Sequence, residues 1–301
     1  MTVTAAPAVW AGLDHLDAPG ALAFASEVEA GGFEAFWTRE GFGREPFALL
    51  GAVAGVTSTL RLGTGIANIY ARDAITARAA ANTVQDLSGG RFTLGLGVSH
   101  PSWVHGVRGH EYRAPAAAME RYLDDYGAVD YKGPAPAVAV PVVVAALRGA
   151  MLRVAGARAD GAMPYMVTVE SVAAARRTLD DTAAAAGRPR PRLIVMVPVV
   201  PTDDQAIARA AARKALGAYS ALPAYARSYL AQGFAEEDFA SPDGLTDGFL
   251  DRMVALGPRA GVVARLGEVA DAGADEIAIV PIGEDGAPGN LEAVRRLALP
   301  W

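Results

Sequence analysis

Two polar residues follow a short apolar segment in the first third of the chain. Residues 92–97 (FTLGLG) are flanked by glycines and are typical of a buried parallel strand. Ser99 and His100 come directly after this segment. Histidine gains and loses a proton near neutral pH, so His100 is a candidate general acid or base. The alternative is a histidine that only bonds a loop carbonyl. Gly97 has no side chain, so a ligand can approach the backbone there.

The first two predicted strands also end in polar residues. Arg39 and Glu40 follow the second, and Asp14 and His15 follow the first. Glu40 would act as a proton carrier if burial raised its pKa. The alternative is a surface pair between Arg39 and Glu40. Asp14 and His15 would face the same end of the fold, as candidate substrate contacts. Aromatic candidates for the wall of a substrate pocket are Trp37, Tyr70 and Trp103. Simple packing is the commoner role of such rings.

A candidate phosphate site lies at Leu147, Arg148 and Gly149, between a predicted strand and a predicted helix. Free backbone amides at the start of a helix bind phosphate, and Arg148 adds a positive charge. The alternative is an ordinary surface arginine. No metal site is expected, because His105 and His110 are five residues apart and no HExxH pattern occurs.

Composition excludes several classes of protein. The 301 residues include no cysteine, which rules out disulfides, thiolate metal sites and cysteine nucleophiles. The net charge is −6 and no basic run occurs, so no nucleic-acid partner is expected. The longest apolar run, near residues 138–147, is too short for a membrane span and contains Pro141. No leader pattern is evident at the N-terminus, so we expect a cytoplasmic protein that acts on a small-molecule substrate.

These polar residues need a scaffold that brings strand ends together. The segments that we expect to form strands are 9–13, 33–38, 60–66, 92–97, 142–146, 161–166, 192–199 and 276–282. Helical segments separate them, and Asp73 is the predicted N-cap of one. Eight such units predict an α/β fold of the (β/α)8 TIM-barrel class, whose chemistry lies at the carboxyl ends of the strands. We expect one domain over residues 1–301, with an irregular insertion near 218–258. A Rossmann fold is disfavoured, because neither Gly63-x-Gly65 nor Gly95-x-Gly97 has the third glycine.

Several segments resemble one known superfamily, the luciferase-like monooxygenases, and in particular its coenzyme F420-dependent oxidoreductase branch. They are GFEAFWTRE, LRLGTGIANIYARD, SGGRFTLGLGVSH, AALRGAMLRVAGARADGAMPYMVT and AGADEIAI. The resemblance implies a luciferase-like TIM barrel that binds F420, transfers a hydride to or from a small organic substrate, and forms a homodimer. One alternative is a monooxygenase that uses reduced FMN. Another is a flavin-binding protein without catalytic activity.

The resemblance also implies where the cofactor lies. A non-prolyl cis peptide at Gly65–Ile66 would press against the ring. The predicted cofactor contacts are Thr64, Gly65, Ile66, Ala67, Asn68, Gly97, Val98, Ser99, Leu147, Arg148 and Gly149. His100 stands where related enzymes have a glutamate that handles a proton. Glu40 stands where some have a histidine, and Leu147-Arg148 replaces a common Gly-Gly pair, so these two sites depart from the pattern.

Overall fold

Eight parallel strands close into a barrel in the computed structural model, which describes residues 7–241 and 244–298. The barrel strands are β1 (Ala8–Trp10), β2 (Ala35–Thr38), β3 (Arg61–Thr64), β5 (Phe92–Gly97), β6 (Val142–Ala145), β7 (Gly161–Met163), β8 (Arg192–Pro201) and β10 (Glu276–Pro281). Neighbours pair in this order, and β10 closes the ring by pairing with both β8 and β1. The predicted TIM barrel is confirmed.

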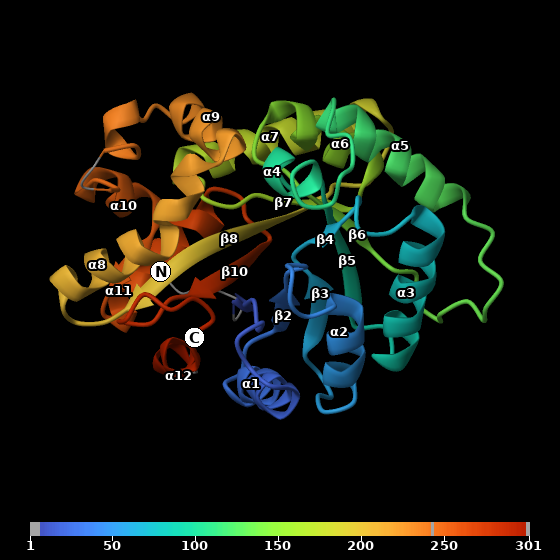
Figure 1. The fold of residues 1–301 in the computed structure, drawn as a ribbon, viewed down its shortest axis with the longest axis horizontal. Helices are drawn as coiled ribbons and strands as arrows, with labels where there is room; N and C mark the ends of the chain where they lie inside the picture. The colour runs from blue at the N-terminus through green and yellow to red at the C-terminus, as the bar shows by residue number, and fades with distance from the viewer. Residues whose placement is uncertain (1–6, 242–243, 299–301) are drawn as a thin grey trace.

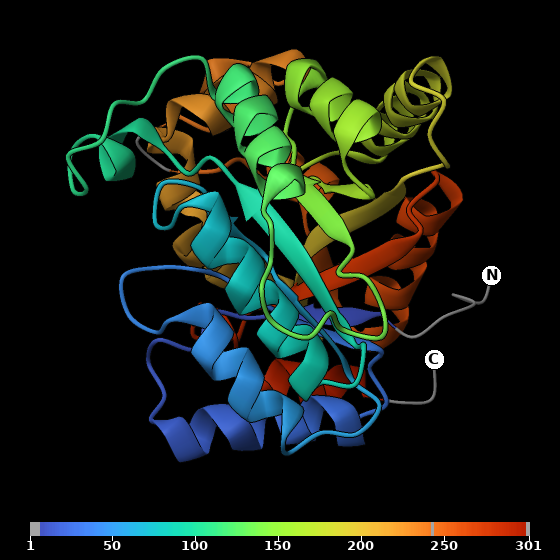
Figure 2. The same ribbon diagram turned by 90° about the vertical axis from the view of Figure 1, so that its right-hand side faces the viewer.

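Helices surround this barrel (Figure 1, Figure 2). They are α1 (Ala18–Ala30), α2 (Pro46–Ala54), α3 (Ala74–Leu87), α4 (Pro101–Val104), α5 (Pro115–Ala128), α6 (Gly149–Arg158), α7 (Val169–Ala185), α8 (Gln205–Leu216), α9 (Pro223–Ala231), α10 (Asp247–Met253), α11 (Arg259–Asp271) and α12 (Leu291–Leu297). Asp73 caps α3 as predicted, because its carboxylate accepts the Thr76 N–H at 2.7 Å. No described helix is long and apolar enough to cross a membrane.

The segment 218–258 differs from the prediction. It contains α9 and α10, the short 3-10 helices η1 (Gly217–Ala221) and η2 (Glu236–Asp238), and strand β9 (Ala255–Gly257), which pairs with β8. Residues 242–243 lie outside the described residues. Short helices give weak periodicity, and here they are held by aromatic packing: Tyr229 contacts both Phe239 and Phe249, with ring centroids 5.2 and 4.9 Å away.

The pairing of the third barrel strand with β5 is irregular. Strand β3 continues into the two-residue strand β4 (Ala67–Asn68), and both pair with β5. Gly63 is opposite Thr93 and Ala67 is opposite Leu96, so four steps along one strand match three along its neighbour. One extra residue is therefore inserted as a bulge, a feature that is common beside active sites.

The amino end of the barrel contains a buried charge cluster. Glu276 at the start of β10 has a side chain only 5% exposed, and it pairs with Arg61 at 2.8 Å and with Arg192. The indole N–H of Trp37 donates to the same carboxylate at 2.7 Å. Trp37 is thus buried inside the barrel and bonded toward its amino end, and the prediction that it walls a substrate pocket stays a prediction.

Candidate functional site

The bulge between β3 and β4 forms a platform, defined here as residues 64–68, at the carboxyl end of the barrel. Its Gly65–Ile66 peptide bond is cis, which confirms that prediction. The two glycines of the neighbouring strand make room for the bulge. A Cβ on Gly95 would lie 1.9 Å from the Thr64 carbonyl oxygen, and one on Gly97 would lie 2.4 Å from Ile66 Cδ1. The space above Gly97 is therefore filled by the protein's own chain, and not left open for a ligand as we expected.

Buried hydrogen bonds fix the platform from below. The Thr64 hydroxyl donates to the Gly95 carbonyl at 2.8 Å and accepts the Gly95 N–H at 2.9 Å. The indole N–H of Trp10, on β1, donates to the Gly65 carbonyl. Sequence reasoning missed Trp10, because only the closed barrel brings β1 near the end of β3. Thr64 thus supports the platform from inside and uses its hydroxyl there.

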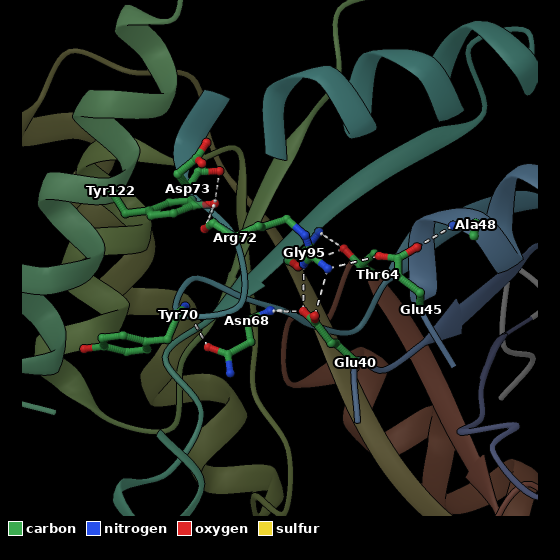
Figure 3. Close-up of polar contacts among 10 residues, drawn as sticks. All are labelled: Glu40, Glu45, Ala48, Thr64, Asn68, Tyr70, Arg72, Asp73, Gly95 and Tyr122. Atoms are coloured by element: carbon green, nitrogen blue, oxygen red, sulfur yellow. Dashed lines mark hydrogen bonds and ion pairs between the residues drawn. The ribbon is translucent and has the colours of Figure 1, made fainter. Parts of the chain in front are cut away.

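Glu40 is tied into an ion-pair network beside the platform (Figure 3). The guanidinium of Arg72 donates to both Glu40 oxygens, at 2.7 and 2.8 Å. The side chain of Glu40 is 8% exposed and that of Arg72 is 10% exposed. The backbone N–H of Asn68 donates to Glu40 Oε2 at 2.7 Å. The Glu40 N–H donates to the Ile66 carbonyl at 3.0 Å. Glu40 therefore anchors both ends of the second half of the platform.

The surface pair between Arg39 and Glu40 is wrong, since Arg39 pairs with Asp14 at 2.9 Å. Asp14 also accepts the backbone N–H of Arg44 at 2.8 Å, so its carboxylate holds the loop that follows β2. His15 is exposed beside it. The structure therefore gives Asp14 a local structural role, and the predicted substrate contact by Asp14 and His15 stays a prediction.

Asn68 is buried at the end of β4, and its side-chain oxygen accepts the N–H of Tyr70 at 3.0 Å. Its amide nitrogen points away from the Glu40 network (Figure 3). In that orientation the amide nitrogen is available as a hydrogen-bond donor. Tyr70 itself tilts against Tyr112, with ring centroids 5.9 Å apart, and the Tyr112 hydroxyl donates to the Ser99 carbonyl at 3.4 Å. Folding thus brings three of the predicted residues, Asn68, Tyr70 and Ser99, to one edge.

His100 lies at the N-cap of α4, directly after Ser99. Its Nδ1 atom is buried without a hydrogen-bond partner. Burial lowers the pKa of the imidazole below its ordinary value of 6.5, so the ring is neutral at pH 7. Trp103 meets the imidazole edge-on at 5.3 Å, and Tyr225 of α9 lies 5.7 Å away. A neutral imidazole with an unused nitrogen has the chemistry of a general base.

Two arginines lie near the start of α6. Arg148 is the exposed N-cap residue, and the guanidinium of Arg153 lies near the first helical turn, 3.2 Å from where a Gly149 Cβ would stand. Within residues 7–241 and 244–298, neither side chain forms an ion pair or a side-chain hydrogen bond. Sequence reasoning missed Arg153, although a positive charge one turn after the helix start was a readable signal. Together with the free amides, these arginines form a site suited to an anion.

No cluster of three histidine, aspartate or glutamate residues in the described part of the chain is arranged to hold a metal ion.

Comparison with known proteins gives this geometry a context. A family model described as luciferase-like monooxygenase matches residues 3–276. A protein of Mycobacterium tuberculosis, provisionally named a coenzyme F420-dependent oxidoreductase, is 37% identical over 97 residues, which cover 32% of this chain and only 28% of that protein. A 5,10-methylenetetrahydromethanopterin reductase of Methanolobus tindarius is 24% identical over 90% of this chain and 92% of that protein. The solved coenzyme F420-dependent tetrahydromethanopterin reductase of Methanopyrus kandleri has a similar fold, with a TM-score of 0.78, 20% identity and 97% coverage of both chains.

Proposed function

This chain belongs to the luciferase-like monooxygenase family, and from that premise we propose that it is a coenzyme F420-dependent oxidoreductase acting on a small organic substrate. Two of the similar proteins carry coenzyme F420 in their names, which favours this coenzyme over FMN. The observation that carries the proposal is the anion site at the start of α6, where Arg148 is the exposed N-cap residue and the Arg153 guanidinium lies against the first helical turn. Such a site suits the phosphate of a deazaflavin side chain.

The residues present fit the coenzyme. The platform would support the ring, and the amide nitrogen of Asn68 would donate to the ring's pyrimidine edge. The start of α6 would hold the phosphate. The unpartnered Nδ1 of His100 is a polar atom whose partner is expected to come from a ligand. When bound, the coenzyme supplies a carbon that gives or accepts a hydride.

Within this proposal His100 handles the proton. Its neutral imidazole would take a proton from an alcohol-like substrate, and in the opposite direction the protonated ring would return one. Replacement of His100 by alanine is expected to reduce turnover about 100-fold to 10,000-fold and to leave coenzyme affinity within about twofold. Turnover is followed by the absorbance of the coenzyme, and affinity by its fluorescence. Wild-type turnover in the variant would remove His100 from the mechanism.

Glu40 has a different part in this proposal from the proton carrier that its position suggested. Both of its oxygens are occupied by Arg72 and by the Asn68 N–H. We therefore assign it to positioning: it holds Asn68 and Ile66 in place, and so holds the platform.

Titration of the pure protein with F420 and with FMN, followed by fluorescence, tests the cofactor. We expect F420 to bind more tightly. The changes Arg148→Gln and Arg153→Gln should each weaken F420 binding about tenfold to 100-fold, since a charged hydrogen bond contributes roughly 1.5–3 kcal/mol. Arg177→Gln, an exposed arginine of α7 without a partner, is the matched control and should have no effect.

Two outcomes would contradict the proposal. Tighter binding of FMN, together with oxygen uptake in the presence of reduced FMN, would make the protein an FMN monooxygenase. Bound coenzyme that undergoes no redox change with any donor or acceptor tested would make it a binding protein.

A further inference from the structure

The segment between β5 and α5 is attached to the rest of the protein by few polar contacts. We call residues 99–114 the strap; it contains α4, which lies at the carboxyl end of the barrel (Figure 1, Figure 2). Its backbone groups bond within the strap: the His100 carbonyl accepts the N–H groups of Trp103 and Val104, at 3.0 and 2.9 Å. In the part of the chain that the structure describes, no hydrogen bond or ion pair joins residues 100–113 to a residue outside the strap. The strap can therefore change position without the loss of a polar contact with the barrel.

Side-chain rings hold the strap in place instead. Trp103 meets Phe42, in the loop after β2, edge-on at 5.6 Å, and the guanidinium of Arg108 lies 5.9 Å from the centre of the same ring. We call this contact of Trp103 and Arg108 with Phe42 the latch. Tyr112 makes a second ring contact with Tyr70, at 5.9 Å. Phe42 is 60% exposed, so the latch buries little apolar surface and contributes only a small part of the stability of the fold.

The observed position of the strap is energetically unfavourable at several points. Ser99 and Ala114, which bound the strap, have φ angles of 57° and 41°, a left-handed conformation that is unfavourable in residues other than glycine. Two buried nitrogens of the strap, His100 Nδ1 and Arg108 Nε, have no hydrogen-bond partner among the described residues. A buried polar atom without a partner destabilises the conformation that buries it. Displacement of the strap would relieve these costs, which narrows the free-energy gap between the observed and the displaced position.

The strap carries the residue to which the proposed function gives the proton. His100 follows Ser99, and its imidazole contacts Trp103, which belongs to the strap, and Tyr225, which belongs to α9. Displacement of the strap would therefore take His100 away from Tyr225 and into water. A ligand that bonds His100 Nδ1 would satisfy this atom in the observed position, and so would favour that position over the displaced one.

We propose that the strap is a lid, hinged at Ser99 and Ala114 and held closed by the latch at Phe42, which carries His100 into and out of the mouth of the barrel. This inference rests on the proposed function, because it regulates the site at which that function places His100. The position seen in the structure is the closed one. Closure would bring the imidazole to the substrate and shield both from water, so a substrate would meet its base only in the closed state. Phe42 is then a positioning residue, since it acts on the reaction only through the strap.

The distance between two spin labels tests the motion. Because the chain has no cysteine, nitroxides can be attached through Val107→Cys, at an exposed position of the strap, and Leu87→Cys, at the exposed last residue of α3. In the coenzyme-free protein, Phe42→Ala removes the latch and should increase the population at the open distance about threefold to tenfold, as measured by double electron–electron resonance. Phe42→Tyr keeps the ring and should behave like the wild type. Leu230→Ala, which removes an exposed apolar side chain of α9 away from the latch, is the matched control and should also have no effect.

Ala114→Gly provides an independent variant with the opposite expected effect. Glycine adopts a left-handed backbone more readily than alanine does, so this change should favour the closed position and reduce the open population about threefold to tenfold. A strap that is simply loose would instead open further when a glycine is introduced. An increase in the open population of Ala114→Gly would therefore contradict a hinge at this residue.

NMR titration of the histidines tests whether His100 moves with the strap. The chain has four histidines, and the signal that His100→Asn removes identifies that of His100. Burial lowers the pKa of His100 in the closed position, so Phe42→Ala should raise this pKa toward 6.5 and leave the titration of His15, outside the strap, unchanged. An unchanged label distance in Phe42→Ala, or a changed distance with the His100 titration of the wild type, would overturn the inference. Both measurements use the coenzyme-free protein, so their results are independent of whether F420 or FMN binds.

Discussion

Two regions at the carboxyl end of the barrel are stabilised in opposite ways: the platform, and the aromatic wall formed by the contacting rings of His100, Tyr225, Tyr219, Tyr165 and Trp10. On the platform side almost every polar group has a partner: Glu40 accepts from Arg72 and Asn68, and Thr64 bonds both polar groups of Gly95. On the wall side rings pack against rings, and three buried polar atoms have no partner in the described structure. They are His100 Nδ1, Ser220 Oγ and Tyr229 Oη.

The difference matters for function. Fully satisfied polar networks are rigid and specify one geometry, which suits a surface that must hold a coenzyme ring. Apolar packing with spare polar atoms leaves hydrogen-bonding capacity for a ligand. Under the proposed function, the platform side would hold the coenzyme ring and the wall side would meet the substrate. Four substitutions or conditions test this contrast, from the largest expected effect to the smallest.

Breaking the Glu40–Arg72 pair should have the largest effect. Glu40→Gln leaves a buried guanidinium without its bidentate partner, and removal of one member of a buried pair destabilises proteins by about 3–5 kcal/mol. The free energy of unfolding in urea measures the loss. Arg39→Gln, which breaks the more exposed pair with Asp14, is the control and should change stability by less than about 1 kcal/mol. Equal losses from the two changes would show that the buried Glu40–Arg72 pair stabilises the fold no more than the exposed Arg39–Asp14 pair.

Substitution of the two glycines beneath the platform by alanine should reduce stability by different amounts. Gly95→Ala meets the Thr64 backbone at 1.9 Å and should destabilise by about 3 kcal/mol, whereas Gly97→Ala meets the flexible end of Ile66 and should cost about 1 kcal/mol. Ile66→Ala in the Gly97→Ala background should recover part of the smaller loss, as measured by a double-mutant cycle. The absence of any coupling would mean that Ile66 is not what Gly97 accommodates.

On the wall side, the lowered pKa of His100 should make the stability of the fold depend on pH. Its pKa in the folded protein is lowered from 6.5 by burial. The unfolded chain therefore binds more protons just below pH 6.5, so stability is full above that pH and declines as the pH falls toward the folded pKa. His100→Asn should lack this decline. The difference in Tm between the two proteins, measured across this range, gives the result. Parallel curves at every pH would contradict the lowered pKa.

The smallest effect is expected at Tyr229. Its hydroxyl is buried without a partner, so Tyr229→Phe removes a polar group that contributes no hydrogen bond. The free energy of unfolding should change by less than about 0.5 kcal/mol, in either direction. A loss above about 1 kcal/mol would show that this hydroxyl has a partner that stabilises the fold, and the contrast between the two sides would weaken.

Local patterns predicted the elements well and the contacts between them poorly. Residues 92–97 and the cap at Asp73 could be predicted because strand and helix signals are local. The role of Gly97 could not be predicted, since the space above it is filled by Ile66, which lies in the bulge between β3 and β4. Trp37 shows the same limit: aromatic character does not reveal that its indole bonds Glu276, a residue 239 positions away. The segment 218–258 was missed because its helices are short and depend on long-range ring contacts.

The sequence alone determined the order of strands and helices, and hence the barrel, because alternating apolar strands and amphipathic helices leave few ways to bury their apolar faces. It also supplied the family, through motifs at the strand ends. Only the tertiary structure decided which partner each polar group found. Closing the barrel placed Arg72 on Glu40, Ile66 over Gly97 and Tyr225 beside His100. Those pairings depend on distances between distant segments, which no local pattern encodes.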